Sequence, residues 1–488
     1  MSLDITPGIR SRTVTVAALL TTSMFTGGWL IVRGTHETTT TPAEAQRLFS
    51  QVFNHVERFY VDSVPPNALY RKAVDGMLYE LEDPYTSLLP PDKFGRLTEA
   101  TTGNYAGVGL QVDVRDGWIV VIAPAPGSPA ERAGIQPGDR VVEVGGRSAK
   151  GWTLDEAMAA FRGPPNTKLS LRIERPGMIS PLPYTLERTP LHQSAVRRIA
   201  MLPNAVGYID LKAFSDSTTR ELTSSINALS AKGMKSLILD MRSNPGGLLN
   251  QGLAVADMFL GAGQRIASLK GRTDANREYN DTTAQRWPGL PLVILTDDRS
   301  ASAAEIVAGA LQDHDRALVV GEPTYGKGSA QSIISLGAIG GLKITTARWY
   351  TPAGRSISRR AIRDDSDTEE EPAQKFKTDA GRTVFGGGGI APDVVTADST
   401  WRRQSRVLQM ALGRKVGQFR DAITDYSLAL KAKGEVKSPQ FVVTPEMLEE
   451  VWKRMVARGV EIPRMTYDES APLVSSLLAY DIARYVFG

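Results

Sequence analysis

The stretch PLVILTDDRSASAAEIVAGALQD (Pro291–Asp313) passes from an apolar run typical of a buried strand into a segment with helical periodicity. Two serines, Ser300 and Ser302, stand among small residues at the turn between the two parts. Serine is common at a helix N-terminus because its oxygen accepts a main-chain N–H that the first turn leaves over. One serine can therefore be a cap, and the other can be a nucleophile if the chain supplies an activating base.

Strands and helices alternate on both sides of this stretch. From about Pro203 onward, amphipathic helical segments separate four apolar runs, AVGYIDL, SLILDMR, PLVILT and RALVV. Apolar strands that alternate with helices predict βαβ crossovers and a parallel sheet buried on both faces. This part of the chain is therefore expected to form an α/β core.

A glycine-punctuated pattern covers Tyr105–Gly177, upstream of that core. Its alternating runs predict strands at Leu110–Val114, Trp118–Ile122, Arg140–Val144 and Lys168–Ile173. Between them, Thr153–Arg162 predicts a helix, because Thr153 and Glu156 have the spacing of a capping box. A compact β-rich module follows from this pattern.

Helical segments flank these two modules. The apolar residues of the segment from about Ala43 to Gly76 fall on one helical face, and they are Leu48, Val52, Val56 and Tyr60. From Trp401 the tail has similar spacing, and we expect it to be mainly helical. The charged segment Ala361–Thr383 predicts an exposed loop.

The composition excludes several classes of protein. The chain has 488 residues, which is long enough for two or three domains, and its net charge is +4 on 57 basic and 53 acidic residues. No long basic block interleaved with aromatic residues occurs, which argues against a nucleic-acid binder. There are no cysteines, which excludes disulfides, thiolate metal sites and cysteine nucleophiles.

The N-terminus predicts export from the cytoplasm. Arg10 and Arg12 precede an uncharged stretch, Thr13–Val32, of about the length that spans a bilayer. The stretch is typical of a signal peptide or an uncleaved signal anchor, and the lack of a clear small-residue cleavage site favours the anchor. The rest of the chain is then expected on the periplasmic or extracytoplasmic side, in the cell envelope or secreted.

No histidine is well placed to activate Ser302. His314 lies at the far end of the predicted helix, about four turns from the serine. His36 lies beside the apolar N-terminal stretch and His55 in the early helical segment, whereas His192 lies in TPLHQSAV, a segment without an acidic residue. No H-E-x-x-H motif or carboxylate–histidine cluster has metal spacing, so a Ser–His–Asp triad or a metal hydrolase is poorly supported.

A lysine held neutral in a dry pocket is the remaining base. Free lysine has a pKa near ~10.4, and burial can lower it by about 3–5 units. Lys327 stands between Gly326 and Gly328 just after the strand-like run ALVV, and Gln331 follows where its amide oxygen can hold the amine. An exposed turn lysine is the alternative, whereas a phosphate loop would need Ser or Thr after the lysine.

Acyl chemistry on serine also needs an oxyanion hole of main-chain N–H groups. The segment Leu237–Leu249 runs from a buried strand into Asn-Pro-Gly-Gly, where glycines allow the amides to turn toward a ligand. The N–H of Ala303, at the start of the predicted helix, would be the second donor. A strand-to-helix turn without a ligand is the alternative.

Together these segments resemble the carboxy-terminal processing proteases, a family of PDZ-containing serine endopeptidases with a Ser–Lys active site. The resemblance runs from about Leu48 to about Val395, with the motifs in the family's order. These motifs are YVD, DPYTSLLPP, LILDMRSNPGG, DRSASAAEIVAGALQD, GEPTYGKGSAQ, WYTPAGRSI and GGGGIAPDVV. The acidic run DDSDTEEE is longer than the family pattern leads us to expect.

The resemblance implies a role for each candidate. Ser302 would be the nucleophile, Lys327 the general base and Gln331 its orienting partner. The amides of Gly247 and Ala303 would form the oxyanion hole, with Gly246 as the fallback for Gly247. Ser300 is left as a cap or a structural hydroxyl.

The β-rich module resembles the PDZ domains of this family. The run GVGL, whose residues are Gly107, Val108, Gly109 and Leu110, would bind the terminal carboxylate of a peptide that adds as an extra strand. Arg162 occupies the place of a basic residue that links the PDZ module to the protease in some members. The resemblance thus implies capture of polypeptides with exposed apolar C-termini.

The expected fold is an α/β protease core with crotonase-like βαβ units, an inserted β-rich PDZ domain and helical N- and C-terminal extensions. The expected domains are a signal anchor or signal peptide at 1–34, a helical segment at 35–98, a PDZ domain at 99–187, a Ser–Lys protease core at 188–400 and a helical extension at 401–488.

The expected function is that of a serine endopeptidase of the carboxy-terminal processing type, without a cofactor or metal. Its partners would be polypeptide substrates and, through the N-terminal segment, the membrane, with no nucleic acid. A homo-oligomer or an adaptor protein remains possible. The alternatives are a catalytically silent PDZ adaptor and a crotonase-like acyl-CoA enzyme.

Overall fold

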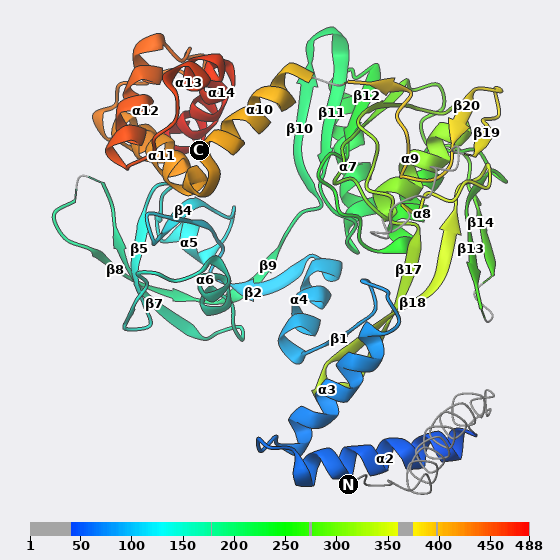
Figure 1. Cartoon of the computed structure of the whole chain (residues 1–488). Helices are drawn as coiled ribbons and strands as arrows, with labels where there is room; N and C mark the ends of the chain where they lie inside the picture. The colour runs from blue at the N-terminus through cyan, green and yellow to red at the C-terminus, as the bar shows by residue number, and fades with distance from the viewer. Residues whose placement is uncertain (1–40, 177, 273–275, 360–373, 397–398, 488) are drawn as a thin grey trace, which may run out of the picture. The chain divides into compact units, whose positions relative to one another are not determined.

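The computed structural model describes residues 41–176, 178–272, 276–359, 374–396 and 399–487 (Figure 1). The predicted signal anchor at Thr13–Val32 and the acidic run of the charged segment lie outside the described residues. Among the helices of the described ranges, none is both long enough and apolar enough to cross a membrane. The chain divides into two compact units, Met1–Leu88 and Leu89–Gly488.

The first unit contains the predicted N-terminal helical segment as two helices, α2 (Pro42–Phe59) and α3 (Pro66–Tyr79). A capping box between Thr41 and Glu44 starts α2. Phe53 of α2 stacks on Tyr70 of α3 with ring centroids 4.1 Å apart. The apolar face that the sequence predicts for α2 is largely exposed within the structure, because Phe53 is the helix's one buried residue.

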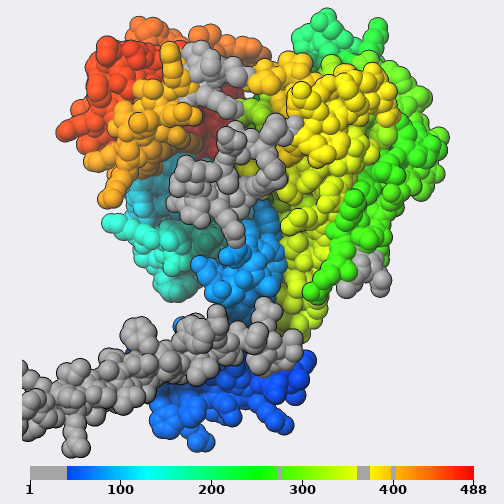
Figure 2. All heavy atoms as spheres, turned by 45° about the vertical axis from the view of Figure 1, so that its right-hand side comes forward, coloured from blue at the N-terminus to red at the C-terminus, as the bar shows by residue number. Residues whose placement is uncertain are grey.

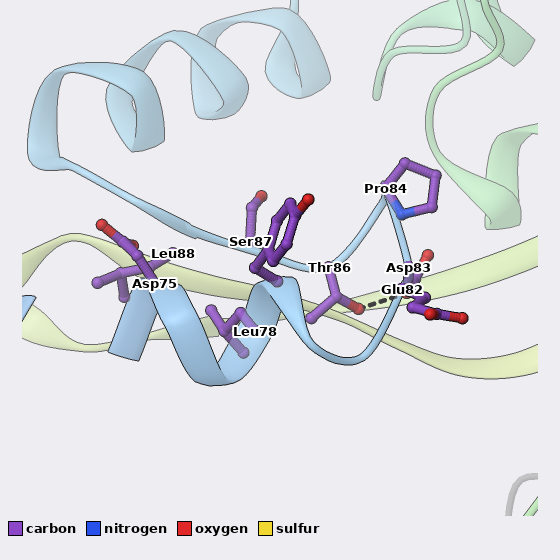
Figure 3. A pocket seen from close by; sticks show the side chains of 9 residues that line it. Asp75, Leu78, Glu82, Asp83, Pro84, Thr86, Ser87 and Leu88 are labelled. Carbon is purple, nitrogen blue, oxygen red and sulfur yellow. Dashed lines mark hydrogen bonds between the residues drawn. The ribbon is translucent and has the colours of Figure 1, made fainter. Parts of the chain in front are cut away.

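The predicted turn-rich connector DPYTSLLPP closes this unit. The carboxylate of Asp83 accepts hydrogen bonds from the Tyr85 N–H and the Thr86 hydroxyl, so the turn is held by its own side chain. The turn and the end of α3 line a pocket of about 420 Å³, and Leu78 and Thr86 are among the lining residues drawn in Figure 3. Strand β1 (Ser87–Leu89) and helix α4 (Pro91–Thr102) follow.

The β-rich module forms an antiparallel sheet in the order β3-β4-β5-β7-β8, with β6 paired to β5 (Figure 1). Its elements are β3 (Leu110–Arg115), β4 (Trp118–Pro124), α5 (Pro129–Arg132), β5 (Arg140–Val144), β6 (Arg147–Ser148), α6 (Leu154–Phe161), β7 (Lys168–Glu174) and β8 (Leu182–Glu187). The four predicted strands and the capped helix are confirmed. The sheet and α6 enclose a separate core that includes Val121, Val141 and Phe161.

The chain enters and leaves this module through one two-stranded ribbon. Strand β2 (Asn104–Gly107) pairs antiparallel with β9 (Thr189–His192). The imidazole of His192 lies 3.0 Å from the side-chain oxygen of Asn104 and 2.6 Å from the carboxylate of Glu221 in the core. The module is therefore an insertion attached to the core by both of its ends.

The core contains a six-stranded sheet in the order β10-β11-β12-β15-β16-β21, parallel except for the edge strand β10. Its elements are β10 (Val196–Leu202), β11 (Val206–Leu211), α7 (Thr218–Ala231), β12 (Ser236–Asp240), α8 (Leu249–Asp257), β15 (Leu292–Thr296), α9 (Ala303–Asp313), β16 (Leu318–Gly321) and β21 (Val394–Val395). One row of fully buried residues crosses it in register, namely Ile209, Leu239, Ile294 and Val319. The predicted α/β core is confirmed.

A second sheet completes this part of the chain. It includes strands β13, β14, β17 and β18, with β18 between β17 and β13. Their bounds, with those of a small hairpin, are β13 (Arg265–Gly271), β14 (Arg277–Asn280), β17 (Ser329–Ser335), β18 (Gly341–Tyr350), β19 (Lys375–Lys377) and β20 (Thr383–Phe385). Ala267, Trp349 and other residues of this sheet pack into the same core as the first one.

The tail folds into a helical bundle with its own core, as the sequence predicts. The helices are α10 (Ser399–Leu412), α11 (Val416–Lys433), α12 (Pro445–Ala457), α13 (Arg464–Glu469) and α14 (Ala471–Ile482). Helix α11 contacts the β-rich module, where Lys431 donates to the Pro137 carbonyl at 2.7 Å and Asp421 accepts from the Asp116 N–H at 3.2 Å. Figure 2 shows the bundle, in orange and red, against that module.

Candidate active site

Ser302 stands at a strained turn between β15 and α9. Its φ of 56° and ψ of −114° lie in a region that residues with a side chain rarely adopt. Such strain costs on the order of 1–3 kcal/mol and persists where the surrounding structure enforces it, which is common at functional sites. Helix α9 begins directly after it, so the half-buried Ser302 lies at the positive end of the helix dipole.

Ser300 has a structural position. Its hydroxyl donates to the Met241 carbonyl at 2.8 Å and accepts from the Asp297 N–H at 2.9 Å, and the residue is fully buried. It therefore joins the turn of Ser302 to the end of β12. Of the two roles left open for Ser300, cap or structural hydroxyl, the structure supports the second, because the N-cap of α9 is Ser302.

A buried carboxylate, Glu305, joins the turn of Ser302 to the loop of Lys327. One oxygen accepts from the N–H of Ser302 at 2.7 Å and from that of Lys327 at 2.9 Å. The other accepts from the Thr324 hydroxyl at 2.6 Å and the Gly326 N–H at 2.7 Å. Burial raises the pKa of Glu305, and these four donors act against that rise.

Sequence reasoning missed Glu305, although a signal was present. Glu305 follows Ser302 by three residues, which is the spacing of a capping box. The same pattern at Thr153 and Glu156 correctly predicts helix α6. In α9, however, the glutamate also reaches a segment more than twenty residues farther along the chain, and helix-end rules do not predict that contact.

The loop that carries Lys327 is held between the two sheets. The Trp349 indole N–H donates to the Lys327 carbonyl at 2.9 Å, and Lys327 itself is half-buried. A Cβ on Gly326 would lie 3.0 Å from the Ile357 carbonyl oxygen, and one on Gly328 would lie 2.4 Å from the Ser358 hydroxyl. Both glycines are thus required by the close passage of the segment that contains the GRSI motif.

The glycine loop after β12 lies against the turn of Ser302. A Cβ on Gly246 would lie 2.8 Å from the Cβ of Ser302 and 2.9 Å from the nitrogen of Ala303. The N–H of Gly246 donates to the Asn244 side chain at 2.9 Å. The N–H groups of Gly247 and Ala303 make no hydrogen bond within the described residues. The unpaired amides are therefore those of the two predicted donors, and the fallback Gly246 is engaged.

Gln331 lies on β17, four residues after Lys327. Its amide nitrogen donates to the Ser329 hydroxyl at 2.9 Å and to the Thr345 hydroxyl at 3.2 Å. These bonds fix the amide plane on the β17–β18 pair. The proposed role of Gln331 as the orienting partner of Lys327 stays a prediction.

The predicted peptide-binding residues lie at the edge of the β-rich sheet. Gly107 forms an antiparallel bridge with Arg162, and the Val108 N–H donates to the Phe161 carbonyl at 3.3 Å. The Val108 amide is thus engaged within the module. A Cβ on Gly109, whose φ is 76°, would lie 2.2 Å from the Cβ of Ser128. Leu110 begins the edge strand β3.

Arg162 reaches out of the module. Its guanidinium pairs with the carboxylate of Glu99 on α4 and lies over the ring of Tyr105, 5.4 Å from the centroid. It therefore joins the module to the helix that precedes it. Its place in peptide binding stays a prediction.

Acidic residues elsewhere near the site have structural partners. Burial acts to raise the pKa of Asp297, but hydrogen bonds from Ser243, Arg299 and Ser300 hold it below its usual range. His314 caps the far end of α9, with its ring nitrogens 2.7 Å from Asp379 and from the Arg265 carbonyl. No cluster of three or more His, Cys, Asp or Glu residues within the described part of the chain has the arrangement of a metal site.

Comparison with known proteins connects this geometry to a family. Residues 205–368 match the profile of Peptidase family S41, and residues 120–175 match that of the PDZ domain. The carboxy-terminal-processing protease of Bartonella bacilliformis is 37% identical over 338 residues, which cover 67% of this chain and 76% of that protein. The carboxy-terminal processing protease CtpA of Bacillus subtilis is 32% identical over 73% of this chain and 75% of its own length. The Synechocystis carboxyl-terminal-processing protease is 38% identical over 62% and 72%.

Proposed function

Because the chain belongs to peptidase family S41, the carboxy-terminal processing serine proteases, we propose that it cleaves polypeptides through Ser302 and Lys327. The observation that carries this proposal is the carboxylate of Glu305. It binds the main-chain N–H of both residues and so holds the strained serine turn against the lysine loop. No carboxylate joins Ser302 in this way to any histidine of the described residues.

The mechanism is acyl transfer in two steps. Neutral Lys327 takes the hydroxyl proton as Ser302 attacks the scissile carbonyl, and the resulting oxyanion accepts hydrogen bonds from the Gly247 and Ala303 amides. The ammonium of Lys327 then protonates the leaving amine as the C–N bond breaks. Water, deprotonated by Lys327, releases the acyl group and restores the serine. Gln331 orients the lysine amine in this scheme, and no cofactor takes part.

Substrate capture is assigned to the PDZ domain. Within the described residues the edge strand β3 pairs with β4 alone, so an extended peptide can add to its other edge. The Gly107–Leu110 loop at the start of β3 would hold the terminal carboxylate, and the buried apolar residues behind it favour an apolar last residue. Arg162 would link peptide binding to helix α4, which precedes the PDZ domain, through its ion pair with Glu99.

The place of action follows from the N-terminus. We propose that Thr13–Val32 directs the chain to the cell envelope, as an anchor or as a cleaved signal, with the protease on the extracytoplasmic side. A homo-oligomer or an adaptor protein is compatible with this arrangement and is not required by the chemistry.

Cleavage of a disordered substrate with an apolar C-terminus tests the proposal. We would compare the wild type with Ser302→Ala, Lys327→Ala and Lys327→Arg, and map the products by mass. All three variants should be inactive. Ser302→Ala lacks the attacking hydroxyl, and Lys327→Ala lacks the base. In Lys327→Arg the guanidinium stays charged and cannot act as the base. Lys377→Ala removes an exposed lysine of the β19–β20 hairpin and should cleave normally. Normal cleavage by Ser302→Ala would disprove the proposed nucleophile.

A further inference from the structure

Asn244 is a fully buried polar residue in the loop beside the nucleophile, with 0% of its surface exposed. It precedes Pro245 in the Asn-Pro-Gly-Gly turn that follows β12. A buried amide is costly unless both its donor and its acceptor are paired. Its hydrogen bonds therefore indicate which segments the Asn-Pro-Gly-Gly turn holds in place.

Three segments meet at Asn244. Its side-chain nitrogen donates to the Leu211 carbonyl, at the end of β11, at 2.8 Å. Its side-chain oxygen accepts from the Gly246 N–H at 2.9 Å. Its main-chain carbonyl accepts from the Ala301 N–H, one residue before Ser302, at 2.9 Å. One residue thus connects the sheet, the glycine loop and the nucleophile turn.

These bonds decide which amide of the glycine loop is left for a ligand. Because the Gly246 N–H is bound to Asn244, it cannot stabilise an oxyanion. The next N–H, that of Gly247, has no partner in the described part of the chain, and the Gly246 carbonyl is held by the Phe214 N–H at 3.0 Å. The peptide unit between the two glycines is therefore held through its own carbonyl, and the unit before it is held by Asn244.

We propose that Asn244 is the positioning residue of the oxyanion hole. Its side chain sets the direction of the Gly247 N–H, and its main chain sets the distance from that N–H to the Ala303 amide. This inference rests on the proposed function, because it concerns the same serine chemistry. Asn244 does not touch the substrate, and it acts through the two amides that do.

Asparagine is the residue type that this place requires. Aspartate keeps the acceptor for Gly246 but cannot donate to the Leu211 carbonyl, and its charge would lie close to the developing oxyanion. Serine can still accept from an N–H two residues on, but it is too short to reach Leu211 as well. Alanine leaves both partners unpaired in a buried site.

Kinetics of the full-length protein test this proposal. Asn244→Ala should lower kcat by about 100-fold with KM nearly unchanged, because misplaced oxyanion donors weaken the transition state and not substrate capture. Asn244→Ser should retain part of the activity through its contact with Gly246. Thr424→Val is the matched control, because it removes a buried hydrogen bond, from Thr424 to Asp481, that lies in the C-terminal helical bundle and not in the protease core.

A transition-state probe separates positioning from stability. A peptide boronic acid forms a tetrahedral adduct on a reactive serine, whereas the carboxylate product of the same sequence does not. In Asn244→Ala and Asn244→Ser, affinity for the boronic acid should fall by about the same factor as kcat, and affinity for the product should stay within about threefold. Thr424→Val should change the affinity for neither probe. If Asn244→Ala does not fold, Asn244→Ser gives the same comparison.

The inference is overturned if Asn244→Ala cleaves at the wild-type rate. It is also overturned if both probes lose affinity equally in a variant that remains folded, because that result indicates a purely structural role. An active Ser302→Ala would instead overturn the proposed function. An inactive Ser302→Ala together with a fully active Asn244→Ala removes only the role of Asn244.

Discussion

Replacing Glu305 with glutamine is the most informative change outside the reacting groups. The substitution preserves the size of the side chain and converts one of its two acceptor oxygens into a donor. If that donor faces Ser302 and Lys327, two main-chain N–H groups lose their acceptor. If it faces Thr324 and Gly326, the Gly326 N–H loses its acceptor, and the Thr324 hydroxyl already accepts from Ile390.

The size of the effect follows from these contacts. Each buried donor left unpaired costs about 1–3 kcal/mol, so Glu305→Gln should lower the free energy of unfolding by about 2–4 kcal/mol. That is a large share of the ~5–15 kcal/mol that stabilises a typical domain. Because either orientation of the amide breaks part of the four-donor arrangement between the serine turn and the lysine loop, kcat/KM should fall by about 100-fold or more.

Thermal unfolding and steady-state cleavage measure the two effects on the same sample. Asp313→Asn is the control at the opposite end of α9, where Asp313 pairs with the buried Arg355. It should cost about 3 kcal/mol of stability, because it breaks a buried ion pair, but kcat of the folded protein should change little. A Glu305→Gln enzyme with the wild-type kcat/KM would refute the reasoning, whatever its stability.

Three further changes give distinct outcomes. Gly246→Ala places a methyl group 2.8 Å from the Cβ of Ser302, at a residue whose φ is 90°. The rate of cleavage should therefore fall by about 100-fold, while binding of an apolar-tailed peptide is retained. Loss of peptide binding would contradict this expectation. Ser300→Ala should lower stability by about 2 kcal/mol in chemical denaturation, and a loss of activity as complete as that of Ser302→Ala would contradict its structural role. Burial and the Asp116 carboxylate raise the pKa of Asp421 to about 6, so ionisation above that pH costs stability and protonation below it removes the cost. Asp421→Asn should therefore raise the free energy of unfolding at pH 8 by about 1 kcal/mol, after discounting for solvent screening. This gain should fade as the pH falls from 6 toward 4. An equal gain at both ends of a pH series of melting curves would contradict the assignment.

Local sequence patterns determined most of the fold. The alternation of short, continuous apolar runs with longer helical segments is sufficient to predict the α/β core, because the short runs are typical of strands buried on both faces. The four strands of the PDZ domain and its capped helix were predictable for the same reason. The ordered motifs, from DPYTSLLPP to GGGGIAPDVV, placed the chain in its family.

The sequence by itself thus determined the elements, their order and the candidate residues of the site. Only the tertiary structure decided how those residues are held. The sequence pattern around Glu305 predicts a helix cap, but its carboxylate also binds the loop of Lys327. The pattern around Asn244 predicts a turn, but its side chain also accepts from the Gly246 N–H, and the Gly247 N–H has no partner within the described residues. Periodicity and capping depend on neighbours within a few residues, whereas these contacts join segments brought together by packing of the sheets, so no local pattern records them.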